Sequence, residues 1–395
     1  MTMENAEVLV AIGILFLAGL LLDKIGRIVH VPRVTLLILL GALLGPPVLD
    51  LLPHSFNDSN EFYAPTALTM VAFLLGGTLN PETLKAHGRE IMIISLTLVA
   101  VSVVVVATGL WLIGLPVGIA VLLGGLSAAT DPAATHDVIT QTRAKGRFAG
   151  NLLGIVAIDD AWGLLAFSAA LTIAGMLMDQ DAMVAILHGA REVGGAIVLG
   201  LAIGLPAAFL TGRIKPGEPT LIEAVGLVFL CSGFALYFGF SFLLTGMVCG
   251  VTIVNLARHH ERPFYEIERI EWPFMLLFFV MAGASLKTAN MAEIGYICAA
   301  YCVFRALARL LGGWLGGRLA GLPPTESRLT GLGLMPQAGV AIGMALVASE
   351  RFPLIGEDLL AVAVASTIAF EIVGPFLTQI ALRRAAGTEA SETNG

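Results

Sequence analysis

Charged residues are scarce in this sequence: Asp, Glu, Lys and Arg make up 13% of its 395 residues, about half the share in an ordinary soluble domain. Hydrophobic residues make up 57%, and the mean hydropathy is +0.89. The sequence also lacks a basic stripe interleaved with aromatic residues, which excludes nucleic-acid binding on electrostatic grounds. Most of the chain must therefore be surrounded by lipid, which is its first predicted partner.

The sequence has only four cysteines and no features of a signal peptide. The four cysteines all fall in apolar segments, so we expect them to pack as small apolar residues, although Cys298 and Cys302 are one helical turn apart and could share a face for a disulfide or a metal. The first apolar run, 8–22, has no basic region before it and no Ala-x-Ala cleavage site. It is predicted to be a membrane span rather than a signal peptide.

Long apolar runs dominate what remains. A helix crossing about 30 Å of hydrocarbon needs roughly 20 apolar residues, and thirteen such segments are present. They are 7–22, 32–48, 65–79, 91–114, 117–139, 148–176, 193–210, 220–238, 240–256, 272–286, 294–319, 329–348 and 359–382. The sequence predicts an all-α membrane protein of thirteen transmembrane helices in a single transporter domain, 1–382. The tail, 383–395, is too short for a folded cytosolic regulatory domain on this chain.

The basic residues predict the orientation. Lys and Arg are retained on the cytoplasmic side of short loops, and most of the 22 basic residues fall on one side if the N-terminus lies outside. Lys287 and Arg351 are the residues placed in outer loops. We therefore expect a bacterial-type cytoplasmic (inner) membrane protein with its N-terminus outside and its C-terminus in the cytoplasm.

Thirteen segments divide into six, a linker and six, as two inverted repeats would. Repeat one is about 7–176, the linker helix about 193–210, and repeat two about 220–382. The fifth segment of each half is interrupted, by Thr130-Asp131-Pro132 in the first and by Pro336 in the second. Broken helices in corresponding positions point to a binding site near the middle of the membrane. Two simple proline kinks are the alternative.

Ionisable residues at membrane depth are costly, by roughly 2.5 to 3.5 kcal/mol each, so each is a candidate functional group. Adjacent residues of a helix point about 100° apart, so either Asp159 or Asp160 can face an ion pathway while the other pairs with a base. Two acids in one apolar pocket repel, which lets a proton compete with a metal cation. The alternative is a structural ion pair. The predicted intramembrane set is Asp131, Asp159, Asp160, Arg305, Arg309 and Glu371.

The other members of this set have open roles. Asp131, after Thr130, can help to bind a cation at the broken helix or merely cap the following half-helix. Arg305 and Arg309 lie four apart on one face and can pair with the acids or extend to the interface. Glu371 is predicted to be a polar packing or gating group rather than a ligand.

With these residues in place, the chain resembles the monovalent cation/proton antiporter superfamily (the sodium/proton exchangers), and in particular its branch with paired aspartates. The Thr-Asp-Pro element together with the Asp-Asp pair is the specific signal. Weaker matching elements are 31–34 with 41–46, Phe73-Leu74-Leu75-Gly76-Gly77, Phe278-Phe279-Val280 with Gly283, and Arg309-Leu310-Leu311-Gly312.

The resemblance implies exchange of sodium (or lithium) for protons by alternating access, in pH homeostasis and without a cofactor. It implies a homodimer in which a core domain moves against a dimerisation domain, with the fifth and twelfth helices crossing as broken helices. Asp160 would carry the ion and the proton, and Asp160 and Asp131 would bind sodium. Asp159 would pair with Arg309.

Two departures from the branch concern Arg309, where lysine is common, and Asn151, where an acid is common; Arg305, Asn151, Glu371 and Pro336 are kept as accessory site residues. Paired aspartates, as the resemblance implies, would carry two protons per sodium in electrogenic exchange, which is the stoichiometry that we favour from the sequence. A permanently charged Arg309 that holds Asp159 ionised would leave one proton and electroneutral exchange. A potassium/proton antiporter is the main alternative, followed by a transporter of organic anions. An intramembrane aspartyl protease, the enzyme alternative, would need an acid that 331–334 lacks.

Overall fold

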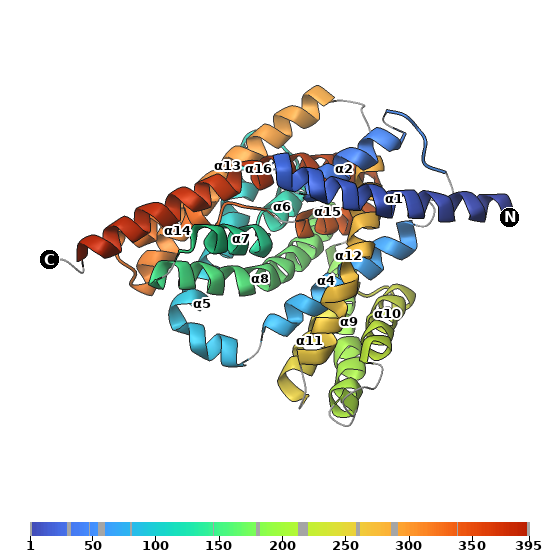
Figure 1. Ribbon diagram of the computed structural model, residues 1–395, viewed down its shortest axis with the longest axis horizontal. Coiled ribbons are helices and arrows are strands. Elements are labelled where there is room, and N and C mark those ends of the chain that lie inside the picture. Colours follow the sequence, from blue (N-terminus) through green and yellow to red (C-terminus); the bar gives the residue numbers. More distant parts are fainter. Residues whose placement is uncertain are drawn as a thin grey trace. The chain divides into compact units, whose positions relative to one another are not determined.

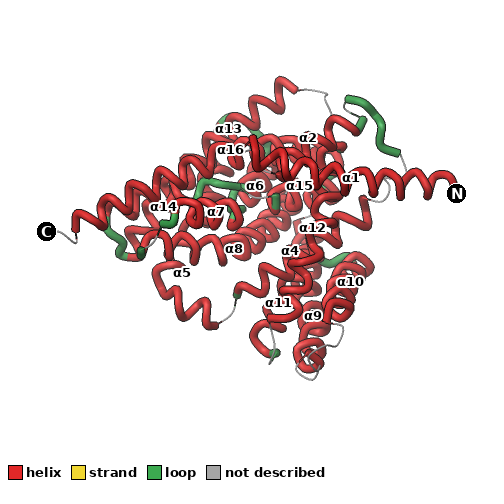
Figure 2. Tube along the Cα trace, viewed as in Figure 1, coloured by secondary structure: helices red, strands yellow, loops and turns green. Residues whose placement is uncertain are grey.

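The computed structural model describes residues 2–29, 33–46, 48–53, 60–79, 81–144, 146–178, 182–211, 220–257, 261–285, 291–337 and 339–392. Within these ranges every regular element is a helix, and no strand occurs (Figure 2). The orientation stays a prediction. Both termini and several of the basic residues on which it rests lie outside the described residues. The termini are Met1 and Gly395, and the basic residues are Lys145, Arg213, Lys215, Arg258 and Lys287. The structure also does not describe Val31 and Pro32, of the 31–34 element.

The chain divides into two compact units, each assembled from distant parts of the sequence. The first unit comprises Met1–Gly77, Glu192–Met291 and Ser349–Val364, and the second comprises Thr78–Arg191, Ala292–Ala348 and Ala365–Gly395. Helices α9 (Ala182–Thr211) and α16 (Pro353–Glu392) each contribute long stretches to both units. Figure 1 shows the helices coloured along the sequence.

The first unit is a helical bundle whose close packing depends on glycine. Helices α2 and α12 lie so near each other that a side chain on Gly41 would collide with the backbone of Val280, and one on Gly283 with that of Ile38. Small residues permit this approach between helices in a membrane. The helices of this unit are α1 (Thr2–Val29), α2 (Arg33–Leu44), α4 (Asn60–Thr78), α10 (Thr220–Phe238), α11 (Phe242–Leu256) and α12 (Glu261–Ala284).

The second unit contains all the predicted intramembrane acids and bases. Helix α8 lies at its centre and packs against α5, α6, α7 and α14 (Figure 1). The helices of this unit are α5 (Pro81–Leu112), α6 (Val117–Leu126), α7 (Pro132–Thr142), α8 (Arg147–Met178), α13 (Met291–Ala320), α14 (Pro324–Gly333) and most of α15 (Val340–Arg351), with the later part of α16.

The two predicted helix breaks are present. Helix α6 ends at Leu126 and α7 begins at Pro132, whose missing N–H and fixed φ suit a first helical position. Helix α14 ends at Gly333 and α15 begins at Val340, with Pro336 between them. Each break is several residues of extended or turn backbone, so these segments are pairs of half-helices rather than kinked helices.

The all-helical membrane fold is confirmed. A helix or a pair of half-helices overlaps each of the thirteen predicted segments, and the chain is a multi-pass integral membrane protein. Among the described residues, seven helical segments are long and apolar enough to cross a membrane by themselves. They are Ala6–Gly26, Gly88–Leu112, Arg147–Met178, Gly189–Leu210, Leu221–Phe238, Ile294–Ala320 and Pro353–Ala386.

The C-terminal residues differ from the sequence interpretation in one respect. The sequence predicts that the last apolar segment ends near 382 and that a short polar tail follows, whereas α16 continues without a break to Glu392. Residues 383–392 include several alanines with arginine and glutamate, which are all good helix formers. Helix propensity therefore extends the helix beyond its apolar part.

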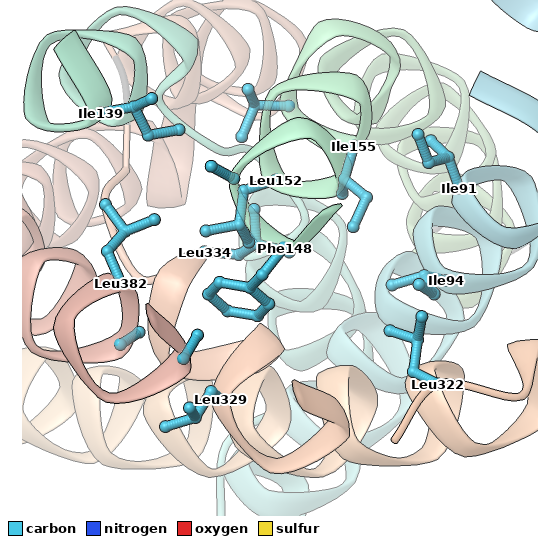
Figure 3. Close-up of a cluster of buried hydrophobic side chains, with 14 of the residues drawn as sticks. Ile91, Ile94, Ile139, Phe148, Leu152, Ile155, Leu322, Leu329, Leu334 and Leu382 are labelled. Carbon is cyan, nitrogen blue, oxygen red and sulfur yellow. The ribbon is translucent and has the colours of Figure 1, made fainter. Parts of the chain in front are cut away.

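A cluster of buried apolar side chains surrounds the first half of α8 (Figure 3). Phe148, Leu152 and Ile155 of α8 meet side chains from α5, α14 and α16, among them Ile91, Ile94, Leu329, Leu334 and Leu382. The cluster reaches Ile158, the residue directly before the paired acids. Tight apolar packing thus borders the acids on this side.

Candidate functional site

Asp160 lies beside the first helix break. Its side chain is 1% exposed, and its Oδ1 accepts two hydrogen bonds from Thr130, one from the backbone N–H and one from the hydroxyl, each 3.0 Å long. Thr130 is itself buried, in the extended backbone between α6 and α7. The break therefore presents a backbone donor and a hydroxyl to one carboxylate of the pair.

Asp159, the neighbouring acid, is bound by different partners. Its Oδ2 lies 3.1 Å from Arg309 Nη1 in a fully buried ion pair, and its Oδ1 accepts a 3.0 Å hydrogen bond from Ser95 of α5. Adjacent positions on α8 point in different directions, which separates the two carboxylates into two environments. Asp159 faces helices α5 and α13, and Asp160 faces the break.

Arg309 also completes the end of α6. Its Nη2 donates to the carbonyl oxygens of Ser127, Ala128 and Ala129 at 3.1, 2.6 and 3.0 Å. Carbonyls at the C-terminal end of a helix have no partners within the helix and carry partial negative charge, so a cation there is favourable. One guanidinium thus binds the acid and the broken helix together.

Arg305, one turn earlier on α13, joins the two breaks. Its Nη1 donates to Met335 O at 2.9 Å, and its Nη2 donates to Ala129 O at 2.9 Å and to Pro336 O at 3.3 Å. The ring of Phe370 lies 4.2 Å from the guanidinium carbon, within the range of a cation–π contact. Arg305 and Arg309 are both 0% exposed, so neither extends to the membrane interface.

Asp131 caps the second half-helix. It is the N-cap of α7, and its Oδ1 accepts a 3.0 Å hydrogen bond from Ala134 N. Its side chain is only partly buried. Asp131 therefore has the capping role considered from the sequence. The negative charge of its carboxylate lies at the break, close to Thr130 and the paired acids.

The accessory residues divide into two groups. Pro336 lies in the site, because its carbonyl binds Arg305. Glu371 is buried at 3% exposure on α16, next to Phe370. Asn151 does not join them, because it precedes Asp160 by nine residues of α8, roughly 13 Å along the helix axis.

Sequence reasoning missed three residues. Ser95, Phe370 and Gln337, whose Nε2 donates to Thr367 Oγ1 at 3.3 Å, all contribute to the site or its surroundings. Each is an isolated polar or aromatic residue in an apolar segment. The signal available was that an isolated buried hydroxyl or amide needs a hydrogen-bond partner.

The site combines two carboxylates, two fixed positive charges, a hydroxyl and the backbone carbonyls of the two helix breaks in a buried setting. Carboxylate, hydroxyl and carbonyl oxygens are the donors that hard cations take in proteins. Among the described residues no group of three or more His, Cys, Asp or Glu side chains is gathered as a metal site. All four cysteines are free.

Several known proteins are similar to this chain over most of its length. "Ammonium/H(+) antiporter subunit AmhT" of Alkalihalophilus pseudofirmus is 24% identical over 345 residues, which cover 85% of this chain and 86% of that protein. "Na(+)/H(+)-K(+) antiporter GerN" of Bacillus cereus is 22% identical and covers 86% of this chain and 88% of that protein.

The fold is also that of a solved antiporter. The structure of the sodium proton antiporter MjNhaP1 from Methanocaldococcus jannaschii at pH 8 superimposes with a TM-score of 0.75 at 19% identity, covering 95% of this chain and 97% of that one. The family model "Sodium/hydrogen exchanger, transmembrane" matches residues 12–384. The chain therefore belongs to the sodium/hydrogen exchanger family, a family of transporters rather than enzymes.

Proposed function

We propose that the protein exchanges sodium for protons across a bacterial-type cytoplasmic membrane, with Asp160 as the group that carries either ion. The observation that carries this proposal is the division of the acid pair. Asp159 is already paired with Arg309, whereas the hydrogen bonds described on Asp160 all come from Thr130 at the helix break. One carboxylate is structural and the other is available for exchange.

The same residues can hold either a proton or a sodium ion. With a proton on its carboxyl group, Asp160 is neutral and suited to a buried site. With sodium bound, the ionised carboxylate of Asp160, the hydroxyl oxygen of Thr130 and the carboxylate of Asp131 would supply ligands. A hydroxyl has two lone pairs, so Thr130 can donate to Asp160 and still present oxygen to a cation. Neither form needs a cofactor.

Two fixed charges make this site suitable for a single monovalent cation. Arg305 and Arg309 neutralise the negative ends of the broken helices and the charge of Asp159. A buried carboxylate next to these bases binds one positive charge at a time, either a proton or a metal ion. Competition between these two is the physical basis of antiport, and alternating access of the site to the two sides of the membrane completes it.

The finer architecture belongs to the same proposal. The thirteen segments are proposed to be thirteen spans, forming two inverted six-helix repeats about the linker 193–210, with the N-terminus outside and the C-terminus in the cytoplasm. The unit that holds the acids would act as the moving core. The family resemblance supports a homodimer formed by the other domain.

Potassium is the alternative cation, and the relatives give it and ammonium specific support. The name of the Bacillus cereus relative includes K(+), and that of the Alkalihalophilus relative specifies ammonium. Both cations are larger than sodium and lose their hydration water more easily, so the size of the site decides between them. Sodium remains our first choice, with lithium accepted as well.

Reconstitution tests the function directly. Purified protein in liposomes with an internal pH dye is challenged with lithium, sodium, potassium, ammonium and choline in turn. Sodium should produce the largest pH change, and Asp160→Asn should abolish it. Ser102→Ala, a buried change on α5 outside the site, serves as the control for folding and insertion. If only potassium drives the pH change, the transported cation is potassium and not sodium. If Asp160→Asn keeps full activity, Asp160 is not the residue that carries the ions.

A further inference from the structure

Ser95 is the one hydroxyl of α5 with a described hydrogen bond to the paired acids. Its Oγ lies 3.0 Å from Asp159 Oδ1, although 64 positions separate the two residues. Both side chains are 0% exposed. The contact connects a helix with no acid or base of its own in the site to the structural half of the acid pair.

The surroundings of Ser95 are apolar. Ile91, Ile94 and Leu98 occupy the same face of α5 and belong to the cluster in Figure 3. A hydroxyl buried among such residues destabilises the protein unless it forms a hydrogen bond. The hydrogen bond to Asp159 offsets this cost at Ser95.

Ser95 and Arg309 hold opposite oxygens of one carboxylate. Arg309 binds Oδ2 from α13, and Ser95 binds Oδ1 from α5. Rotation of the carboxylate about its bond to the Cβ atom would break at least one of these contacts. Asp159 is therefore fixed in orientation by two helices.

We propose that Ser95 is a positioning residue for the cation site: it holds Asp159 in its ion pair with Arg309 and so keeps the Thr130 hydroxyl in place beside Asp160. This inference rests on the proposed function, since it assigns Asp160 and Thr130 to the cation. Arg309, the partner of Asp159, also binds the carbonyls of Ser127, Ala128 and Ala129, which directly precede Thr130. Without Ser95, Oδ1 of Asp159 would lack this donor, and the ion pair that holds the residues before Thr130 would be less firmly positioned.

Loss of Ser95 should therefore weaken cation binding without removing the carrier. In Ser95→Ala, Asp159 and Arg309 are held less firmly, the helix break that carries Thr130 is less fixed, and the cation loses a positioned ligand. A hydrogen bond to a charged group is strong enough that we expect the apparent KM for sodium to rise about three- to tenfold. The maximal rate should stay within about twofold of the parent, because Asp160 and both arginines remain.

The chain offers a matched control on the same helix. Ser102 lies seven residues after Ser95, two turns along the same face of α5, and is also 0% exposed. Among the described residues its Oγ has no hydrogen-bond partner. Ser102→Ala removes the same atom from the same helix but touches no acid, so its KM should equal that of the parent.

The experiment measures sodium-dependent proton flux in proteoliposomes for the parent, Ser95→Ala, Ser95→Thr and Ser102→Ala, at several sodium concentrations. Ser95→Thr keeps the hydroxyl and should restore a KM near that of the parent. Thermal unfolding in detergent checks each variant. If Ser95→Ala does not fold, Ser95→Cys, with its weaker donor, takes its place and should give a raised KM.

Three outcomes would overturn the proposal: equal KM values for Ser95→Ala and Ser102→Ala, a fall in maximal rate alone, or failure of Ser95→Thr to recover. Failure of the proposed function looks different, because the parent and Ser102→Ala would then also show no sodium-driven flux. In that event the same comparison is made with potassium or ammonium, whichever cation the parent transports.

Discussion

Arg309 Nη1 lies 3.1 Å from Asp159 Oδ2 with both side chains fully buried, and the same guanidinium donates to three carbonyls at the end of α6. Acid, base and broken helix thus form one connected network. Removing one partner leaves a buried charge without compensation, which is far more costly than removing an exposed pair. This asymmetry leads to the first prediction.

Asp159→Asn should destabilise the protein by about 3–5 kcal/mol, because Arg309 loses its buried counter-charge. The matched control is Glu90→Gln, which breaks the ion pair between Glu90 and Arg147, whose side chains are 41% and 49% exposed. An exposed pair contributes only about 0–1 kcal/mol. Denaturant unfolding in detergent measures both variants, and equal losses would show that the buried ion pair has no special role in stability.

Asp131→Asn separates the charge of Asp131 from its cap. Asparagine is as good an N-cap as aspartate, so the hydrogen bond to Ala134 N can remain while the negative charge is lost. We expect an unchanged melting temperature and a shifted pH profile of exchange. The apparent KM for the cation should rise by about tenfold, because the cation loses roughly one charge-assisted contact. A variant that melts earlier but exchanges with normal affinity would assign Asp131 to capping alone.

Arg305→Lys should lower the maximal exchange rate by about tenfold or more, because an ammonium group cannot reproduce the planar fork that reaches both helix breaks. Arg305 contacts Ala129 O on one side and Met335 O on the other. Arg318→Lys, at an exposed position on the same helix, is the control and should exchange at the parental rate. Identical rates for the two variants would mean that only the charge of Arg305 matters.

Much of the site could be predicted because its residues are unusual for a membrane segment. Asp159, Asp160 and Asp131 stand out in an apolar sequence, and Pro132 and Pro336 mark the two helix breaks. Proline alone is not decisive, because Pro65, Pro206, Pro273 and Pro375 lie inside continuous helices. The sequence could not decide which arginine pairs with Asp159, because positions four apart share a face. That choice depends on the distance of each guanidinium from α8, which only the packing of α13 fixes.

The sequence marks Ser95 as a hydroxyl that needs a partner, but it could not show that the partner is Asp159. Ser95 and Ser102 are both single serines on the apolar face of α5, and local pattern and propensity treat them alike. One binds Asp159, and the other has no partner described. The difference arises from the packing of α5 against α8, a contact between segments far apart in the chain. The backbone carbonyls that accept hydrogen bonds from Arg305 cannot be predicted from the sequence, because every residue has a carbonyl.

The final prediction concerns the charge moved in each cycle. The resemblance to the paired-aspartate branch implies two protons per sodium, but both oxygens of Asp159 are held by protein donors and its charge is compensated by Arg309. Arginine does not release its proton, so neutralising Asp159 would leave a buried guanidinium unpaired. Only Asp160 remains to trade a proton for a cation.

We therefore expect one proton per cation and electroneutral exchange. The measurement is sodium-driven proton flux in proteoliposomes clamped with potassium and valinomycin at potentials on either side of zero. The flux should be the same at every potential, because each half-cycle carries the same charge whether Asp160 holds a proton or sodium. A tenfold change in an equilibrium corresponds to about 1.4 kcal/mol, and moving one net charge through 100 mV is worth about 2.3 kcal/mol. An electrogenic cycle would therefore respond strongly, and a flux that follows the potential would show that Asp159 also takes up a proton.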